Sequence, residues 1–149
     1  PDLIMEDADR DLHAFPWRIC LAGGWLDQPW VSQLHAGCVI VVNVHPHDEF
    51  KTRSGLATST RSLGIELWGT RAGGQPPVDV PPERLARLLF NVENPVGCAY
   101  VSGSQDALGL MLPGVNRLDY AGDFWPCSTQ HVACAESQAW LQRVLWLVP

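Results

Sequence analysis

Small and hydroxyl-bearing side chains gather between Gly55 and Ser62, where the sequence reads GLATSTRS. The stretch leads into apolar residues of helical period, so it would form the first turn of a helix. Such a turn presents backbone N–H groups and the positive end of the helix dipole, which together attract phosphate. The hydroxyls of Thr58, Ser59 and Thr60 add contacts for phosphate oxygens or Mg²⁺. The alternative is an ordinary capped helix, because Ser and Thr favour this position without a ligand.

A carboxylate takes a comparable position in the stretch from Ser102 to Gly109. Residues 102–104 (SGS) would precede a short helix, which puts Asp106 in its first turn, where the dipole stabilises the anion. A carboxylate there can accept the proton of a hydroxyl group or orient that group for attack on phosphorus. The alternative is that Asp106 only caps the helix.

A glycine turn with polar and aromatic neighbours lies at residues 22–29 (AGGWLDQP). Its carboxylate, amide and indole groups could hold a polyol through hydrogen bonds and ring stacking. The alternative is a tight turn that connects a strand to a helix.

These three stretches depend on the elements that position them. Short apolar runs predict strands, and apolar residues at i, i+3, i+4 and i+7 predict helices. The predicted strands cover residues 18–22, 38–44, 115–120, 124–127 and 144–148, and the predicted helices cover 55–68, 81–93, 105–112 and 135–143. Strands and helices alternate, with one hairpin around residues 121–122, so the predicted fold class is α+β.

Composition limits the partners. The 149 residues are 46% hydrophobic and 17% charged, which is typical of one globular domain, and the net charge is −6. The basic residues are scattered, which argues against a nucleic-acid partner, since phosphate binding needs a clustered basic face. No apolar run reaches the roughly 20 residues of a membrane span, so no membrane partner is expected. Five widely spaced cysteines favour reduced thiols and therefore a cytoplasmic protein.

The two ends of the chain suggest a longer protein. The sequence begins with Pro1 instead of Met and ends at Pro149, directly after the predicted strand 144–148. A strand at a terminus lacks a neighbour on one side, so we expect residues 1–149 to be a single domain of a larger chain.

Taken in order, the three stretches resemble the motifs of the GHMP kinase superfamily, and especially its bacterial heptose- and fucose-type sugar kinases. The run from Arg18 to Asp27 is similar to the first motif, a strand followed by Ala-Gly-Gly and an acidic residue. Residues 55–60 are similar to the glycine–serine loop that surrounds the ATP phosphates. Residues 103–106 are similar to the segment that carries the catalytic aspartate, and 113–120 to the glycine and strand that follow it.

The resemblance implies a GHMP-kinase-like N-terminal domain of the ribosomal protein S5 domain 2-like fold. That fold would have a mixed sheet with helices on one face and a left-handed βαβ unit. The chain would be the N-terminal half of a two-domain protein whose C-terminal domain is missing or fused elsewhere.

The resemblance also implies the residue roles of an ATP-dependent kinase that phosphorylates a sugar. Asp106 would be catalytic and face the attacking sugar hydroxyl. The ATP phosphates would be bound by Gly55, Leu56, Ala57, Thr58, Ser59 and Thr60, and Mg²⁺ by Ser59 and Glu93. The sugar would be bound by Arg18, Gly23, Gly24 and Asp27.

Two residues depart from the family pattern. Ala57 stands where the phosphate loop usually has glycine, which adds a methyl group where the backbone approaches phosphate. Ala107 stands where sugar kinases usually have Gln after the aspartate. The departure in the phosphate loop favours an alternative function, a non-catalytic GHMP-like domain that binds a sugar or nucleotide, or a fragment of a nucleotide-sugar pathway enzyme.

Overall fold

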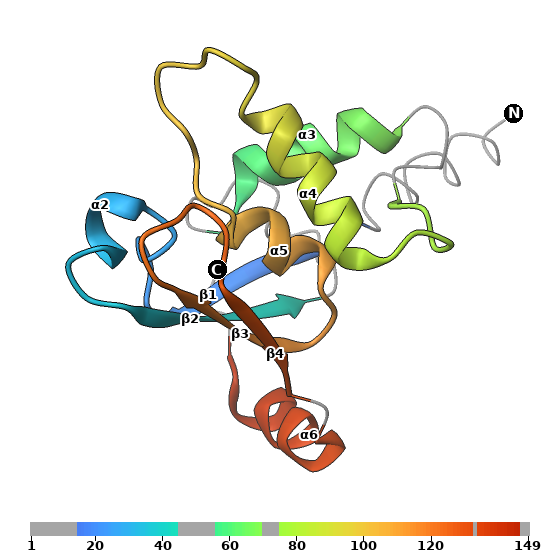
Figure 1. Cartoon of the computed structure of the whole chain (residues 1–149). Helices are drawn as coiled ribbons and strands as arrows, with labels where there is room; N and C mark the ends of the chain where they lie inside the picture. The colour runs from blue at the N-terminus through green and yellow to red at the C-terminus, as the bar shows by residue number, and fades with distance from the viewer. Residues whose placement is uncertain (1–14, 45–55, 70–74, 133, 147–149) are drawn as a thin grey trace, which may run out of the picture.

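The computed structural model describes residues 15–44, 56–69, 75–132 and 134–146 (Figure 1). Within them the elements follow the order β1 (Trp17–Ala22), α2 (Pro29–Ser32), β2 (Gly37–Val44), α3 (Thr58–Gly69), α4 (Pro82–Glu93), α5 (Gln105–Met111), β3 (Val115–Tyr120), β4 (Ser128–His131) and α6 (Ala135–Val144). One sheet and several helices form the fold, so the α+β class predicted from the sequence is confirmed.

The four strands form one antiparallel sheet in the order β1-β2-β3-β4. Trp17 of β1 pairs with Val44 of β2, and Val41 of β2 pairs with Asn116 of β3. The predicted mixed sheet is therefore wrong for the described residues, and the left-handed βαβ unit has no parallel strand pair among them. The connection from β2 to β3 contains α3, α4 and α5. It brings β3 beside β2 in the opposite direction, so this pair is antiparallel and not the parallel pair that a βαβ unit requires.

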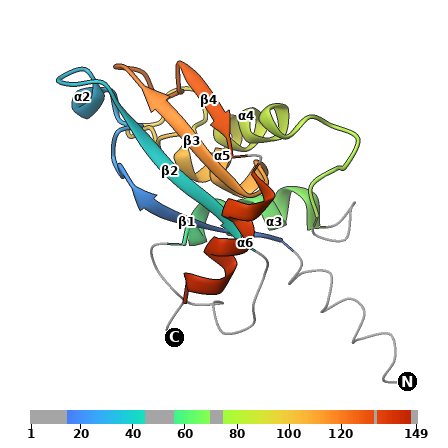
Figure 2. The ribbon, with the colours of Figure 1, turned by 90° about the horizontal axis from the view of Figure 1, so that it is seen from below.

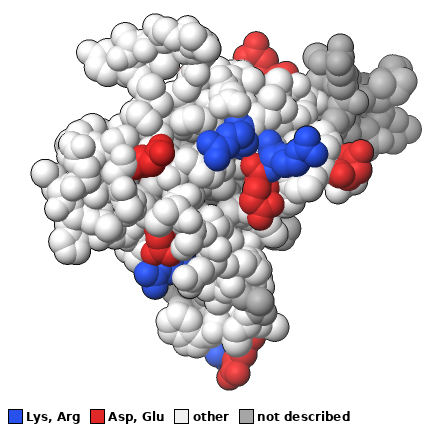
Figure 3. All heavy atoms as spheres, in the orientation of Figure 1, with Lys and Arg blue, Asp and Glu red and all other residues white. Residues whose placement is uncertain are grey.

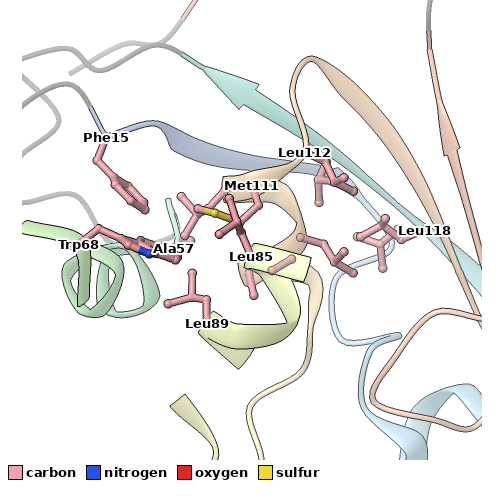
Figure 4. Packing of buried hydrophobic residues seen from close by; sticks show 14 of the residues in the cluster. Phe15, Ala57, Trp68, Leu85, Leu89, Met111, Leu112 and Leu118 are labelled. Atoms are coloured by element: carbon pink, nitrogen blue, oxygen red, sulfur yellow. The ribbon is translucent and has the colours of Figure 1, made fainter. Parts of the chain in front are cut away.

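The main core lies between the sheet and the helices α3, α4 and α5 (Figure 4). Val39 and Val41 of β2 and Leu118 of β3 are completely buried on this side of the sheet. Leu85 and Leu89 are four residues apart on α4 and are both buried against it, as their helical spacing predicts.

Helix α6 lies on the opposite face of the sheet, as Figures 1 and 2 show together. Leu141 of this helix lines a cavity of about 440 Å³ with Val42, Val44 and Val115 of the sheet. The prediction that the helices lie on one face of the sheet is therefore wrong. The physical reason is that β2 has apolar side chains on both faces, so burying its second face requires a further element, which is α6. None of the α6 residues is buried, so this cover is loose.

Two predicted strands are wrong. The hairpin partner of β3 is β4 (Ser128–His131), not residues 124–127. Trp125 of that segment packs edge-on against Phe90, beneath the Arg87 guanidinium, and these contacts hold the segment on α4.

The predicted terminal strand begins at Val144, which instead ends α6, and residues 145–146 are in no strand. Residues 147–148 lie outside the described part. Helix α2 was not among the predicted helix ranges, but it follows residues 22–29 as the alternative of a turn from strand to helix implies.

Charged side chains are sparse on the face shown in Figure 3, where basic and acidic groups lie close together and neither sign forms a continuous field. Among the described residues, none of the helices combines the length and the apolar character needed to cross a membrane.

Helix α5 approaches the sheet closely because it contains Gly109. A Cβ atom at this position would overlap the Cγ atom of Arg18 and lie 3.2 Å from the Cβ atom of Val41. Asn43 of β2 donates from Nδ2 to the carbonyl oxygens of Gly109 and Leu110, at 3.1 and 2.8 Å. These contacts set the distance of α5 from the sheet and therefore the position of its first turn.

We predict that Gly109→Ala lowers the free energy of unfolding by about 1–2 kcal/mol. Overpacking costs about 1–3 kcal/mol, and the overlap with the buried stem of Arg18 places this site in the upper part of that range, at about 2–3 kcal/mol. Ala gains about 1 kcal/mol over Gly inside a helix, so about 1–2 kcal/mol remains. Gly24→Ala is the control, because among the described residues other than its chain neighbours only the sulfur of Cys20, at 3.8 Å, comes near its Cβ position. Urea denaturation measures both variants, and wild-type stability in Gly109→Ala would contradict the close approach.

Candidate functional site

A pocket of about 200 Å³ lies where the C-terminal end of α4 meets the N-terminal ends of α3 and α5. The pocket is lined by Trp25, Asp27, Gln28, Ser59, Thr60, Glu93, Ser102, Gly103, Gln105 and Asp106. Each of these residues except Gly103 has a side chain with a hydrogen-bonding group. Each of the three stretches singled out in the sequence therefore contributes to the same pocket.

Asp106 lies in the first turn of α5 and forms an ion pair with Arg18 of β1. The Arg18 side chain is only 7% exposed and that of Asp106 is 25% exposed. Hydrogen bonds from a guanidinium hold a carboxylate in a defined orientation. Arg18 does not itself line the pocket, so this geometry gives it a contact with Asp106 and lends no support to its predicted contact with a sugar.

Asp27 caps α5 from a distant part of the chain. It is 3% exposed, and its Oδ2 accepts a hydrogen bond from the backbone N–H of Gln105 at 3.2 Å. Gly103 makes room for this carboxylate, because a Cβ atom there would overlap it. Burial raises the pKa of Asp27 above its ordinary value, although the N–H of Gln105 and the charge of Arg18 act in the opposite direction.

Glu93 ends α4 with one carboxylate oxygen bonded and the other without a partner. Its Oε1 accepts a hydrogen bond from the Thr60 hydroxyl of α3 at 2.7 Å. Its Oε2 is buried and has no hydrogen-bond partner among the described residues. Burial raises the pKa of Glu93, the Thr60 hydrogen bond opposes this rise, and the negative charge of Asp27 adds to it. A buried unpaired oxygen costs free energy, so this carboxylate is suited to bind a cation or a hydrogen-bond donor from a ligand.

The two predicted Mg²⁺ ligands, Ser59 and Glu93, both line the pocket. Within the described residues, no group of three or more His, Cys, Asp and Glu side chains could hold a metal ion by itself. Mg²⁺ usually keeps several waters and binds through one or two carboxylates together with substrate phosphates. The unpaired Oε2 of Glu93 and the Ser59 hydroxyl fit a site of that kind, to which phosphate oxygens would also contribute.

The predicted phosphate-binding stretch reaches the pocket only in part. Ser59 and Thr60 line it, and Thr60 is almost completely buried whereas Ser59 is exposed. Thr58 is the first residue of α3 but does not line the pocket. Gly55 lies outside the described residues.

Leu56 and Ala57 are buried in the protein interior. Leu56 packs with Trp17 in a small apolar cluster, and Ala57 belongs to the main core. The φ of Ala57 is 59°, in the left-handed region that favours glycine and costs other residues about 1–2 kcal/mol. Ala57 does not line the pocket, so its departure from the family's glycine strains the backbone but leaves this pocket open.

Neither of the predicted sugar-binding glycines lines the pocket. Gly23 has a φ of 78°, and a Cβ atom there would overlap the carbonyl oxygen of Cys38. A glycine is therefore required at this turn for steric reasons. Gly24 is exposed.

Trp25, Gln28, Ser102 and Gln105 line the pocket although no binding role was assigned to any of them. The amide of Gln28 and the indole of Trp25 belong to the glycine turn, where the sequence offered both groups as possible polyol contacts beside the alternative of a tight turn. Ser102 and Gln105 carried no signal of their own, because their place follows from the packing of α5.

We predict that Glu93→Gln raises the melting temperature at pH 7, since an amide keeps the acceptor for Thr60 and removes the cost of burying a charge. The gain should shrink as the pH falls. The folded protein takes up the Glu93 proton at a higher pH than the unfolded chain does, so the wild type gains stability on acidification towards pH 4.5, the ordinary pKa of the group.

The matched control is Glu83→Gln, in the exposed first turn of α4. This change removes a favourable dipole interaction of about 0.3–1 kcal/mol and should lower the stability slightly at pH 7. Thermal melts from pH 7 to pH 4.5 compare the three proteins. A Glu93→Gln variant less stable than the wild type at pH 7 would refute the unpaired buried charge.

Comparison with known proteins yields no match: none of the protein-family models, curated proteins or solved structures matches this chain. A proposal of function therefore depends on the pocket geometry, together with the motif resemblance carried by the sequence.

Proposed function

We propose that this chain contributes the acceptor site of an ATP-dependent kinase that transfers a phosphoryl group from ATP–Mg²⁺ to a sugar hydroxyl. The observation that supports this most is the meeting of Ser59, Glu93 and Asp106 in one pocket, although they come from three different helices or helix ends. Helix capping would account for Ser59 and Asp106 separately, but it does not require them to meet.

The donor side of the proposed site is the region around the N-terminus of α3. The positive end of this 12-residue helix favours the negative phosphate groups of ATP. Ser59 and Glu93 would hold Mg²⁺ against those phosphates. When bound, the ion neutralises charge on the phosphate oxygens, which is the main requirement for phosphoryl transfer besides positioning.

The acceptor side is Asp106. Its carboxylate is held by Arg18 and can accept a hydrogen bond from a sugar hydroxyl, then the proton as that oxygen bonds to phosphorus. Asp27 and Gln28 line the same pocket and offer further hydrogen bonds to sugar hydroxyls. The buried contacts of Arg18 and Asp27 hold these groups in place before the ligand binds, which lowers the entropy cost of the reaction.

The alternative function, a non-catalytic domain that binds a sugar or nucleotide, is favoured by the size of the pocket. Its volume of about 200 Å³ is below the roughly 300–1,000 Å³ of most small-molecule sites. A sugar fits this space more readily than a sugar and a nucleotide together, so the base and ribose of ATP would have to bind outside it.

We predict that Asp106→Asn lowers the rate of ATP-dependent sugar phosphorylation by about 10²–10⁴-fold, the usual contribution of a general base. The control is Asp119→Asn, which breaks the ion pair between Asp119 and the exposed Arg117, away from the pocket; the Asp119 side chain is 20% exposed, close to the 25% of Asp106. Release of ADP in the presence of a panel of sugars measures the rate, and thermal melting measures stability.

The outcomes separate the two functions. A large loss of rate in Asp106→Asn with a normal rate in Asp119→Asn supports the kinase. Near-normal turnover in Asp106→Asn would remove this carboxylate from the mechanism. A wild type that binds sugar or ATP–Mg²⁺ in calorimetry without releasing ADP would favour the non-catalytic domain.

A further inference from the structure

Trp25 has a backbone conformation that does not suit its side chain. Its φ is 76°, in the left-handed region that glycine adopts without strain and large side chains avoid. The turn is closed by hydrogen bonds from the N–H of Leu26 to the carbonyl of Gly23, at 3.2 Å, and from the N–H of Gln28 to the carbonyl of Trp25, at 3.0 Å. Glycine at this position would relieve the strain and keep both bonds.

The hydrophobic core does not account for the indole. Trp25 is 66% exposed, and its edge-to-face neighbour Trp30, at a ring separation of 6.0 Å, is 59% exposed. Neither belongs to a core cluster. A strained backbone that carries a large exposed aromatic group is typical of a site where a ligand contacts that group.

The rest of the pocket shows which ligand would use the indole. Trp25 lines it together with the carboxylates of Asp27 and Asp106 and the amides of Gln28 and Gln105. A flat apolar surface beside several hydrogen-bonding groups matches a ring-form sugar, which has an apolar C–H face and hydroxyls around its edge. An open-chain polyol has the same hydroxyls but no rigid C–H face.

We propose that Trp25 is a stacking platform that makes the pocket selective for ring-form sugars over open-chain polyols. The indole packs on the C–H face of the ring, while Asp27 and Asp106 bind hydroxyls at its edge. This inference depends on the proposed function only in taking the pocket as the sugar site, and it does not require phosphoryl transfer.

The test is calorimetric titration of the protein with D-glucose, D-galactose, D-mannose and L-fucose, and with the open-chain alditol derived from each. We expect at least one ring sugar to bind, and its alditol to bind about tenfold more weakly. Trp25→Ala should weaken binding of the ring sugar about tenfold, to the level of the alditol, and Trp25→Phe should stay within about threefold of the wild type. Trp140→Ala, which removes a 54% exposed tryptophan on α6, is the matched control and should bind as the wild type does.

A second variant separates binding from folding. Trp25→Gly should be more stable than Trp25→Ala in thermal melts, because it relieves the left-handed strain, yet bind the ring sugar as weakly. The platform is refuted if the wild type binds no ring sugar, if ring and alditol bind equally, or if Trp25→Ala binds as well as the wild type. Selective binding that depends on Trp25 without ADP release would sustain the platform and reject the kinase.

Discussion

The ion pair between the buried Arg18 and the partly exposed Asp106 connects the core of this protein to its candidate site. Arg18 projects from β1, its aliphatic stem fills the space that Gly109 leaves beneath α5, and its guanidinium reaches the first turn of that helix. Of the two groups, Arg18 is the buried one, and without Asp106 its charge would lose this partner in the interior, which costs free energy. The distance between α5 and the sheet and the orientation of the Asp106 carboxylate therefore depend on each other, because Arg18 contacts both Gly109 and Asp106.

The pocket above this pair is electrostatically unbalanced. In the described part of the chain its lining includes the carboxylates of Asp27, Glu93 and Asp106 but no lysine or arginine, and Arg18 pairs with Asp106 from outside the pocket. Burial raises the pKa of Asp27 and of Glu93, so both ionised groups reduce the stability of the fold at neutral pH. This arrangement is suited to bind a cation, as proposed for Mg²⁺ at Glu93, together with the hydroxyl donors of a sugar.

Local patterns predicted the elements around the site well. The helices that became α3, α4 and α5 and the strands that became β1, β2 and β3 begin and end within about three residues of their predicted positions. These segments have a strong apolar period or clear glycine and proline boundaries. The prediction of β4 was wrong because Trp125 looks like a strand residue but packs on α4, and the predicted start of the terminal strand was wrong because Val144 is the last residue of α6.

The sequence by itself determined which residues occupy the first turns of α3 and α5, because helix starts depend on local side chains. It did not determine that those turns meet. The contacts that build the pocket join residues far apart in the chain: 88 positions for Arg18 and Asp106, 78 for Asp27 and Gln105, and 33 for Thr60 and Glu93. Such contacts depend on which face of the sheet each helix covers and on the antiparallel return of β3 beside β2. Both are decided by the packing of the whole core, which no local pattern encodes.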